Sequence, residues 1–102
     1  MMTYSKILKM QKDHGLTDMQ EMIFSGQCWK MEGSVGRAAM NHLNQGSCML
    51  GLKVRHDYYG NRIPSRKEVK AGSKGSYELC RKFWEQVDSG DLDLYGTGLE
   101  DY

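Results

Sequence analysis

The sequence predicts a small α+β fold in a single domain, and three observations carry this prediction. Several segments place apolar residues three and four positions apart, one run of strand length is apolar, and turn residues gather around the only proline. A chain of 102 residues with 39% apolar and 26% charged content forms one modest core. A core of that size gives low stability, so association as a homodimer or higher homo-oligomer, or with a partner, would help.

Four helices are expected, over residues 4–14, 18–25, 28–45 and 77–88. Thr3 or Ser5 can cap the first of them. Thr17 and Gln20 are spaced as in a capping box, which places the start of the second helix there. Ser76 precedes the last helix, whose apolar stripe is the most regular in the chain.

The third helical stretch has two interpretations, because Gly33 and Gly36 lie inside it and glycine costs up to ~1 kcal/mol in a helix interior. A continuous helix would use the two glycines to admit another element closely. A broken one would restart with Ser34 as its N-cap. The capping preference favours the break.

A two-stranded antiparallel hairpin is expected around residues 48–70. Its first strand lies in the apolar run 47–54, its turn at 58–61 and its second strand at 66–70, after Pro64. The first strand alternates apolar residues at Leu50, Leu52 and Val54. A two-stranded hairpin alone is only marginally stable, so we expect it to pack on the helices or to form a larger sheet across a dimer.

Charge is divided unevenly along the chain. Residues 1–87 hold all fourteen Lys and Arg together with eight acids, whereas residues 88–102 hold five acids and no base. We therefore expect a globular domain over 1–87 and an acidic, mobile tail over 88–102. Within the domain, residues 53–74 hold seven bases and two acids, which is nearly all of its positive excess.

Cysteine usage and the start of the chain both bear on the cellular compartment. Cys28, Cys48 and Cys80 are far apart, and each lies next to apolar residues. Three thiols cannot all pair internally and none belongs to a Cys-x-x-Cys pair, so we expect buried reduced thiols, no metal site and no cofactor. The first residues are not followed by a long apolar stretch, so a soluble, cytoplasmic protein without a membrane partner is expected.

The first candidate site is the basic, aromatic hairpin region. Its candidate ligand-binding residues are Arg55, His56, Tyr58, Tyr59, Arg62, Arg66 and Lys67. Arginine forks grip phosphate and tyrosine rings stack on bases, so this set is typical of surfaces that bind a nucleotide or single-stranded nucleic acid. The alternative is an ordinary solvated turn with one tyrosine packed inward.

A second candidate is the segment Gly33–Arg37. If a helix restarts there, free backbone N–H groups from Ser34 onward and the helix dipole would favour an anion, and Arg37 would add a positive charge. The segment lacks the Gly-Lys-Ser/Thr ending of a nucleotide-triphosphate loop. Close helix packing explains the two glycines equally well.

No catalytic constellation is recognisable in the sequence. His56 beside Asp57 is the best acid–base pair, but a loop histidine beside an aspartate is usually solvated. Cys48 lies in an apolar run, where burial raises the pKa of a thiol and makes it unreactive. We therefore expect a protein without enzymatic activity.

The stretches Cys28–Arg37, Asp57–Arg66 and Glu68–Ser76 resemble segments of small proteins encoded by bacteriophages and prophages, a group without an established activity. The resemblance implies a small phage protein made in the cytoplasm of an infected bacterium. Blocking host defence, binding a signalling nucleotide and modulating a host enzyme are common functions in that setting. The resemblance transfers no catalytic residue.

Two functional hypotheses follow. In the first, the protein is a non-catalytic binder of a phosphate-bearing ligand, a nucleotide or nucleic acid, with the hairpin as one wall and Gly33–Arg37 as a second. In the second, it is an inhibitor or adaptor that binds a host protein, for example a defence or nucleic-acid-processing enzyme, through the basic hairpin or the acidic tail.

Overall fold

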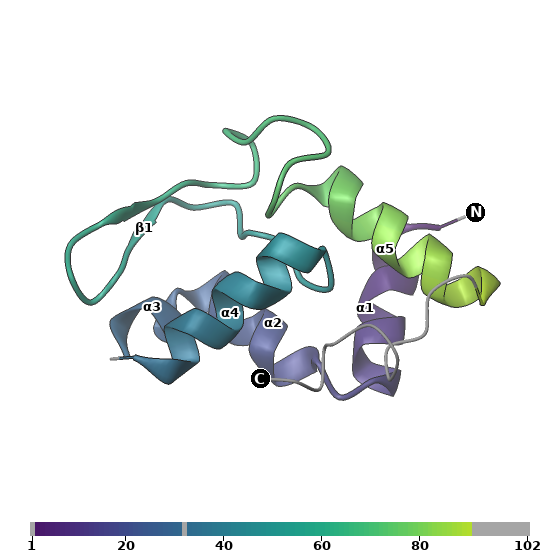
Figure 1. Ribbon diagram of the computed structural model, residues 1–102, viewed down its shortest axis with the longest axis horizontal. Helices are drawn as coiled ribbons and strands as arrows, with labels where there is room; N and C mark the ends of the chain where they lie inside the picture. Colours follow the sequence, from purple (N-terminus) through teal and green to yellow (C-terminus); the bar gives the residue numbers. More distant parts are fainter. Residues whose placement is uncertain (1, 32, 91–102) are drawn as a thin grey trace.

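Five helices and a two-stranded antiparallel sheet follow one another along residues 2–31 and 33–90, which are the residues that the computed structural model describes (Figure 1). Their bounds are α1 Tyr4–Asp13, α2 Thr17–Ser25, α3 Gln27–Lys30, α4 Ser34–Gln45, β1 Arg55–His56, β2 Arg62–Ile63 and α5 Tyr77–Ser89. The predicted α+β class is confirmed. The acidic stretch 91–102 lies outside the described residues.

A capping side chain is found as expected at two of the four helix starts for which one was predicted. Thr3 accepts a hydrogen bond from the Lys6 N–H at 3.1 Å, and Ser76 accepts one from the Leu79 N–H at 3.1 Å. The capping box was wrong, because Leu16 is the N-cap residue of α2 and no side chain caps that end. The Leu16 N–H instead donates to the Gln11 carbonyl at 2.7 Å, which fixes the turn between α1 and α2.

The predicted break near Gly33 is confirmed. α3 ends at Lys30, and Gly33 has φ 78° and ψ −114°, a conformation that favours glycine. The prediction that Ser34 is the N-cap was wrong. Gly33 occupies the cap position, Ser34 is the first residue of α4, and no side-chain hydrogen bond caps this end.

The strands are shorter than expected, and both lie elsewhere. β1 and β2 have two residues each, paired Arg55 with Ile63 and His56 with Arg62. The expected return strand at 66–70 begins instead as a turn, in which the Glu68 N–H donates to the Ser65 carbonyl at 3.0 Å.

The expected first strand at 47–54 is irregular instead. Residues 47–51 are buried, and their polar backbone groups find partners outside a sheet. The Ser47 carbonyl accepts from Gln11 Nε2 at 2.9 Å and from Trp84 Nε1 at 3.1 Å. The Leu50 N–H donates to the Gly75 carbonyl at 2.9 Å. The alternating apolar residues do not share a buried face either. Leu50 is buried, but the exposed fractions of Leu52 and Val54 are 58% and 39%.

This segment separates two apolar clusters. One contains buried residues of α2, α3, α4 and β2 and includes Trp29, Cys48 and Leu50. The other joins α1 to α5 and includes Met49 and Trp84. Successive residues of the segment therefore enter opposite clusters, and Figure 1 shows α1 and α5 at one end of the molecule with α3 and the hairpin at the other.

All three cysteines are buried and free, as expected. Within the described ranges, none of the helices is both long enough and apolar enough to cross a membrane.

Candidate functional site

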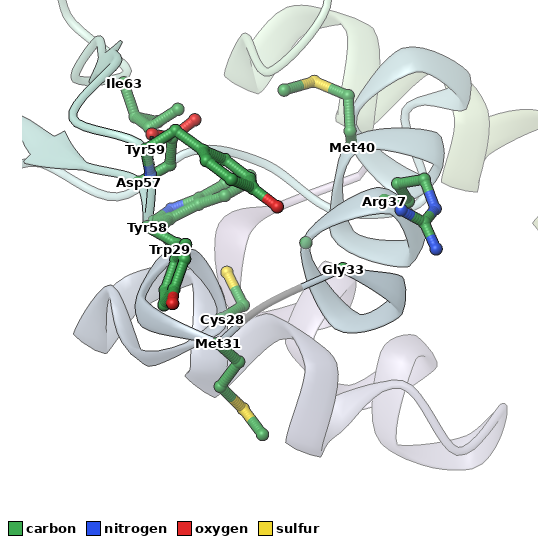
Figure 2. Close-up of a pocket in the computed structure, with 11 residues that line it drawn as sticks. Cys28, Trp29, Met31, Gly33, Arg37, Met40, Asp57, Tyr58, Tyr59 and Ile63 are labelled. Atoms are coloured by element: carbon green, nitrogen blue, oxygen red, sulfur yellow. Dashed lines mark hydrogen bonds between the residues drawn. The ribbon is translucent and has the colours of Figure 1, made fainter.

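A pocket of about 260 Å³ lies where the tip of the hairpin faces α3 and the start of α4 (Figure 2). We call it the aromatic pocket, because Trp29 of α3 and Tyr58 and Tyr59 of the hairpin line it. Arg37 of α4 lines it as well. The two segments predicted separately as candidate sites therefore meet in one hollow.

One face of α4 forms the wall opposite the tyrosines. Gly36 and Arg37 come three and four residues after Gly33, and Met40 comes four and three residues after them, which places all four on the same side of the helix. Gly36 is not required by close packing, because a Cβ added there would lie 3.7 Å from the nearest other atom, the Cys28 carbonyl oxygen. The absence of a side chain at Gly36 keeps this wall open.

The two tyrosines are held at the tip by Asp57. Its Oδ1 accepts from the backbone N–H groups of Tyr59 at 2.9 Å and Asn61 at 2.7 Å, and its Oδ2 accepts from Asn61 Nδ2 at 3.1 Å. Desolvation opposes ionisation here, but the hydrogen bonds from Asn61 and Tyr59 outweigh it and hold the pKa of Asp57 below its usual range. Gly60, with φ 84°, completes the turn.

Both tyrosine rings project into solvent, which disagrees with the alternative in which one tyrosine packs inward. The exposed fractions of Tyr58 and Tyr59 are 57% and 69%. Their ring centroids are 5.1 Å apart with planes at 79°, an edge-to-face pair. Figure 2 shows the Tyr59 ring reaching from the hairpin across Trp29 toward α4. These rings present open faces on a turn that hydrogen bonds fix.

Two predicted arginines lie outside the aromatic pocket and have structural partners. Arg55 donates from Nη2 to the Phe24 carbonyl at 2.9 Å, near the C-terminal end of α2. The Arg66 guanidinium carbon lies 5.4 Å from the Tyr4 ring centroid and 5.9 Å from that of Phe24, in cation–π geometry. Both arginines line a separate hollow of about 340 Å³.

The remaining predicted residues are also outside the aromatic pocket. Arg62 forms an ion pair with Glu68 at 2.5 Å. The hydrogen bond from Arg62, together with one from the Ser65 N–H, lowers the pKa of Glu68. His56, Lys67 and Ser34 are exposed and do not line the pocket. Of the nine predicted site residues, the pocket therefore brings together Arg37, Tyr58 and Tyr59.

Sequence reasoning missed the apolar part of the pocket. Trp29, Met31, Met40 and Ile63 all contribute to its walls. Met40 could have been found, because it lies seven residues after Gly33 on the same helical face. The Asp57 turn also has a local signal, an aspartate followed by Gly and Asn three and four residues later. Ile63 has no such signal, since its position depends on the strand register.

The chemistry of the pocket suits noncovalent binding. Cys28 is the thiol in its wall, and burial raises its pKa to about 11, which keeps it protonated at neutral pH. Burial likewise lowers the pKa of His42, which lies outside the pocket with its Nδ1 at 2.7 Å from the Ser47 hydroxyl. No cluster of three or more His, Cys, Asp or Glu suited to a metal ion occurs among the described residues.

Comparison of the chain with protein-family models, with curated proteins and with solved structures yields no match.

Proposed function

We propose that the protein binds a nucleotide or a single-stranded nucleic acid without chemically altering it, and that the base enters the aromatic pocket. The observation that carries this proposal is the convergence of Trp29, Tyr58 and Tyr59 with Arg37 around one hollow. A flat ring joined to an anion is the chemistry that such a set complements.

The rings supply the recognition of the base. Stacking on an aromatic side chain is worth about 1–3 kcal/mol per base, and it tolerates any base because each has a π face. Tyr58 and Tyr59 have the exposed area to provide it. Because Asp57 already fixes their turn through three hydrogen bonds, little conformational entropy is lost when a ligand arrives.

Arg37 supplies the recognition of the phosphate. Its side chain has no ion-pair partner among residues 2–31 and 33–90, so its charge is available to a ligand. Its guanidinium nitrogens lie 3.8 and 3.9 Å from the position of a Cβ built on Gly33, so they are at the start of α4. The first N–H groups of a helix lack intrahelical partners and add a positive field at that point.

A titration with mononucleotides and short single-stranded oligonucleotides tests this function. Saturable binding should weaken as salt rises, because a phosphate contact releases counterions. Tyr59→Ala and Arg37→Ala should each weaken binding about tenfold or more, equivalent to about 1.4 kcal/mol. Leu52→Ala is the matched control, because Leu52 is also highly exposed but does not line the pocket. Absence of binding across the panel would refute the function.

A second function is favoured by the exposed apolar surface around the pocket. Met31 has an exposed fraction of 43% and lines the pocket with the two tyrosines. Tyrosine and methionine are enriched at protein interfaces. In this case the protein acts as an inhibitor or adaptor on a host bacterial protein. Binding that persists at high salt and is lost in Met31→Ala, without any nucleotide affinity, would favour this function over the first.

A further inference from the structure

A second hollow of about 390 Å³ adjoins the aromatic pocket. Met40 of α4 and Ile63 of β2 line both hollows, so the two share a wall. Figure 2 shows these two side chains at the end of the aromatic pocket away from Met31. The same face of α4 continues past Met40 to Leu43, which lines only the second hollow. The two hollows therefore follow one another along one cleft between α4 and the hairpin.

The second hollow has an apolar floor and a basic edge. Leu43 and Leu50 are buried, and Val69 is partly buried against the same cluster. Lys70 and Lys74 line the edge and are exposed. Neither lysine forms an ion pair with any residue in the described part of the chain, whereas the charge of Arg62 beside them is balanced by Glu68. Two lysines without an ion-pair partner among the described residues thus border a surface able to hold an apolar ring.

The sizes of the hollows favour a ligand that occupies both. Binding pockets for small molecules usually measure roughly 300–1,000 Å³. The aromatic pocket alone, at about 260 Å³, falls below that range, and the two hollows taken together fall inside it. A single base fills the first. If its 5′ phosphate is held by Arg37 at the start of α4, a phosphate on its 3′ oxygen is carried toward the shared wall.

We infer, on the basis of the proposed function, that the ligand consists of two nucleotide units joined through phosphate. One base occupies the aromatic pocket. The linking phosphate crosses the shared wall of Met40 and Ile63 toward Lys70 and Lys74. The second nucleoside lies against the apolar floor at Leu43 and Leu50.

Isothermal titration with three ligands tests the inference: a mononucleotide, the same nucleoside carrying phosphates at both its 3′ and 5′ positions, and the linear dinucleotide. The dinucleotide should bind at least about tenfold more tightly than the mononucleotide. In the double variant Lys70→Ala/Lys74→Ala, the dinucleotide should lose most of that advantage while the mononucleotide affinity stays unchanged. The control is Lys12→Ala/Lys82→Ala, which removes two exposed lysines that do not line either hollow.

Each contrary result has a separate meaning. If mononucleotide and dinucleotide bind equally well, the inference is wrong and the proposed function stands. If the bisphosphate matches the dinucleotide, the second hollow contacts only phosphate and the two-nucleotide ligand is refuted. If none of the three binds, both the proposed function and the inference fail.

Discussion

The side-chain amide of Gln20 pairs with both backbone groups of Met49. Its Nε2 donates to the Met49 carbonyl at 2.8 Å, and its Oε1 accepts from the Met49 N–H at 3.0 Å. Both residues are buried, and the Gln20 amide oxygen also accepts from Gln11 Nε2 at 2.8 Å. A helix side chain thus takes the place of a neighbouring strand and lets an irregular backbone run between the two apolar clusters.

Replacing Gln20 with leucine should be strongly destabilising, because it leaves the buried N–H and carbonyl of Met49 without partners. An unsatisfied buried group costs about 1–3 kcal/mol, so with two such groups we expect the free energy of unfolding to fall by about 2–6 kcal/mol. Urea denaturation measures this change. Glu21→Ala is the control, since Glu21 is exposed on the same helix and its loss should change stability by less than about 0.5 kcal/mol. A similarly small effect of Gln20→Leu would contradict this account.

The hairpin should lose its order in acid. In the folded state, hydrogen bonds lower the pKa of Asp57 below its ordinary 3.8 and that of Glu68 below its ordinary 4.5. Because these values are lower than in the unfolded chain, the stabilisation is complete above the ordinary values and is lost as pH falls through the folded ones. Amide hydrogen exchange at Tyr59 and Ser65, whose N–H groups bond to these carboxylates, measures the effect.

The double variant Asp57→Asn/Glu68→Gln provides the control for that pH dependence. Neither amide titrates, so exchange at the same two N–H groups should no longer change with acidification beyond the intrinsic rate. If the double variant keeps the pH profile of the original protein, the carboxylates are not what holds the hairpin.

The two glycines of the α4 wall should respond differently to alanine. Gly33→Ala places a side chain at φ 78°, where backbone strain costs roughly 1–3 kcal/mol. Gly36→Ala adds a methyl group in ordinary contact with the Cys28 carbonyl, and its better helix propensity should raise stability by up to about 1 kcal/mol. The same methyl narrows the aromatic pocket, so nucleotide affinity should fall. Equal effects of both variants on thermal unfolding would contradict the assigned geometry.

The three native thiols should resist modification until the protein unfolds. Burial raises the pKa of Cys28 to about 11 and that of Cys80 to about 12, and it raises the pKa of Cys48 as well. An aromatic disulfide reagent at neutral pH should therefore modify no thiol in the folded protein and three in urea. Ser34→Cys adds an exposed thiol as a positive control, and it should react at once. Rapid reaction of any native cysteine would show that its cluster opens.

The fold was predictable where local chemistry determines it. The caps at Thr3 and Ser76 and the break at Gly33 depend on residues within a few positions, and each was found. The run 47–54 was predicted to be a strand because it is apolar, has the length of a strand and alternates apolar residues at Leu50, Leu52 and Val54. Its partner Gln20 lies 29 residues away, and no sequence pattern distinguishes a strand neighbour from a glutamine amide.

The site was predictable in part for the same reason. The turn that presents Tyr58 and Tyr59 is local, and it lies within the hairpin region that was predicted as a candidate site. The positions of the basic residues around it depend on partners that are distant in the sequence. Arg55 donates to the Phe24 carbonyl, and Arg66 lies over aromatic rings. Charge counting treats these side chains as one surface with Tyr58 and Tyr59, whereas their partners place both arginines in a hollow separate from the aromatic pocket.

The proposed binding site can be tested most directly through the two tryptophans. Trp29 lines the aromatic pocket, whereas Trp84 is fully buried in the other cluster with its indole N–H bonded to the Ser47 carbonyl at 3.1 Å. The two indole N–H signals in a proton–nitrogen correlation spectrum thus provide a probe and an internal control during a nucleotide titration. We predict that the Trp29 signal shifts saturably while the Trp84 signal stays in place. A Trp29 signal that does not move with any nucleotide or oligonucleotide, or one that moves only together with Trp84, would contradict the proposed site.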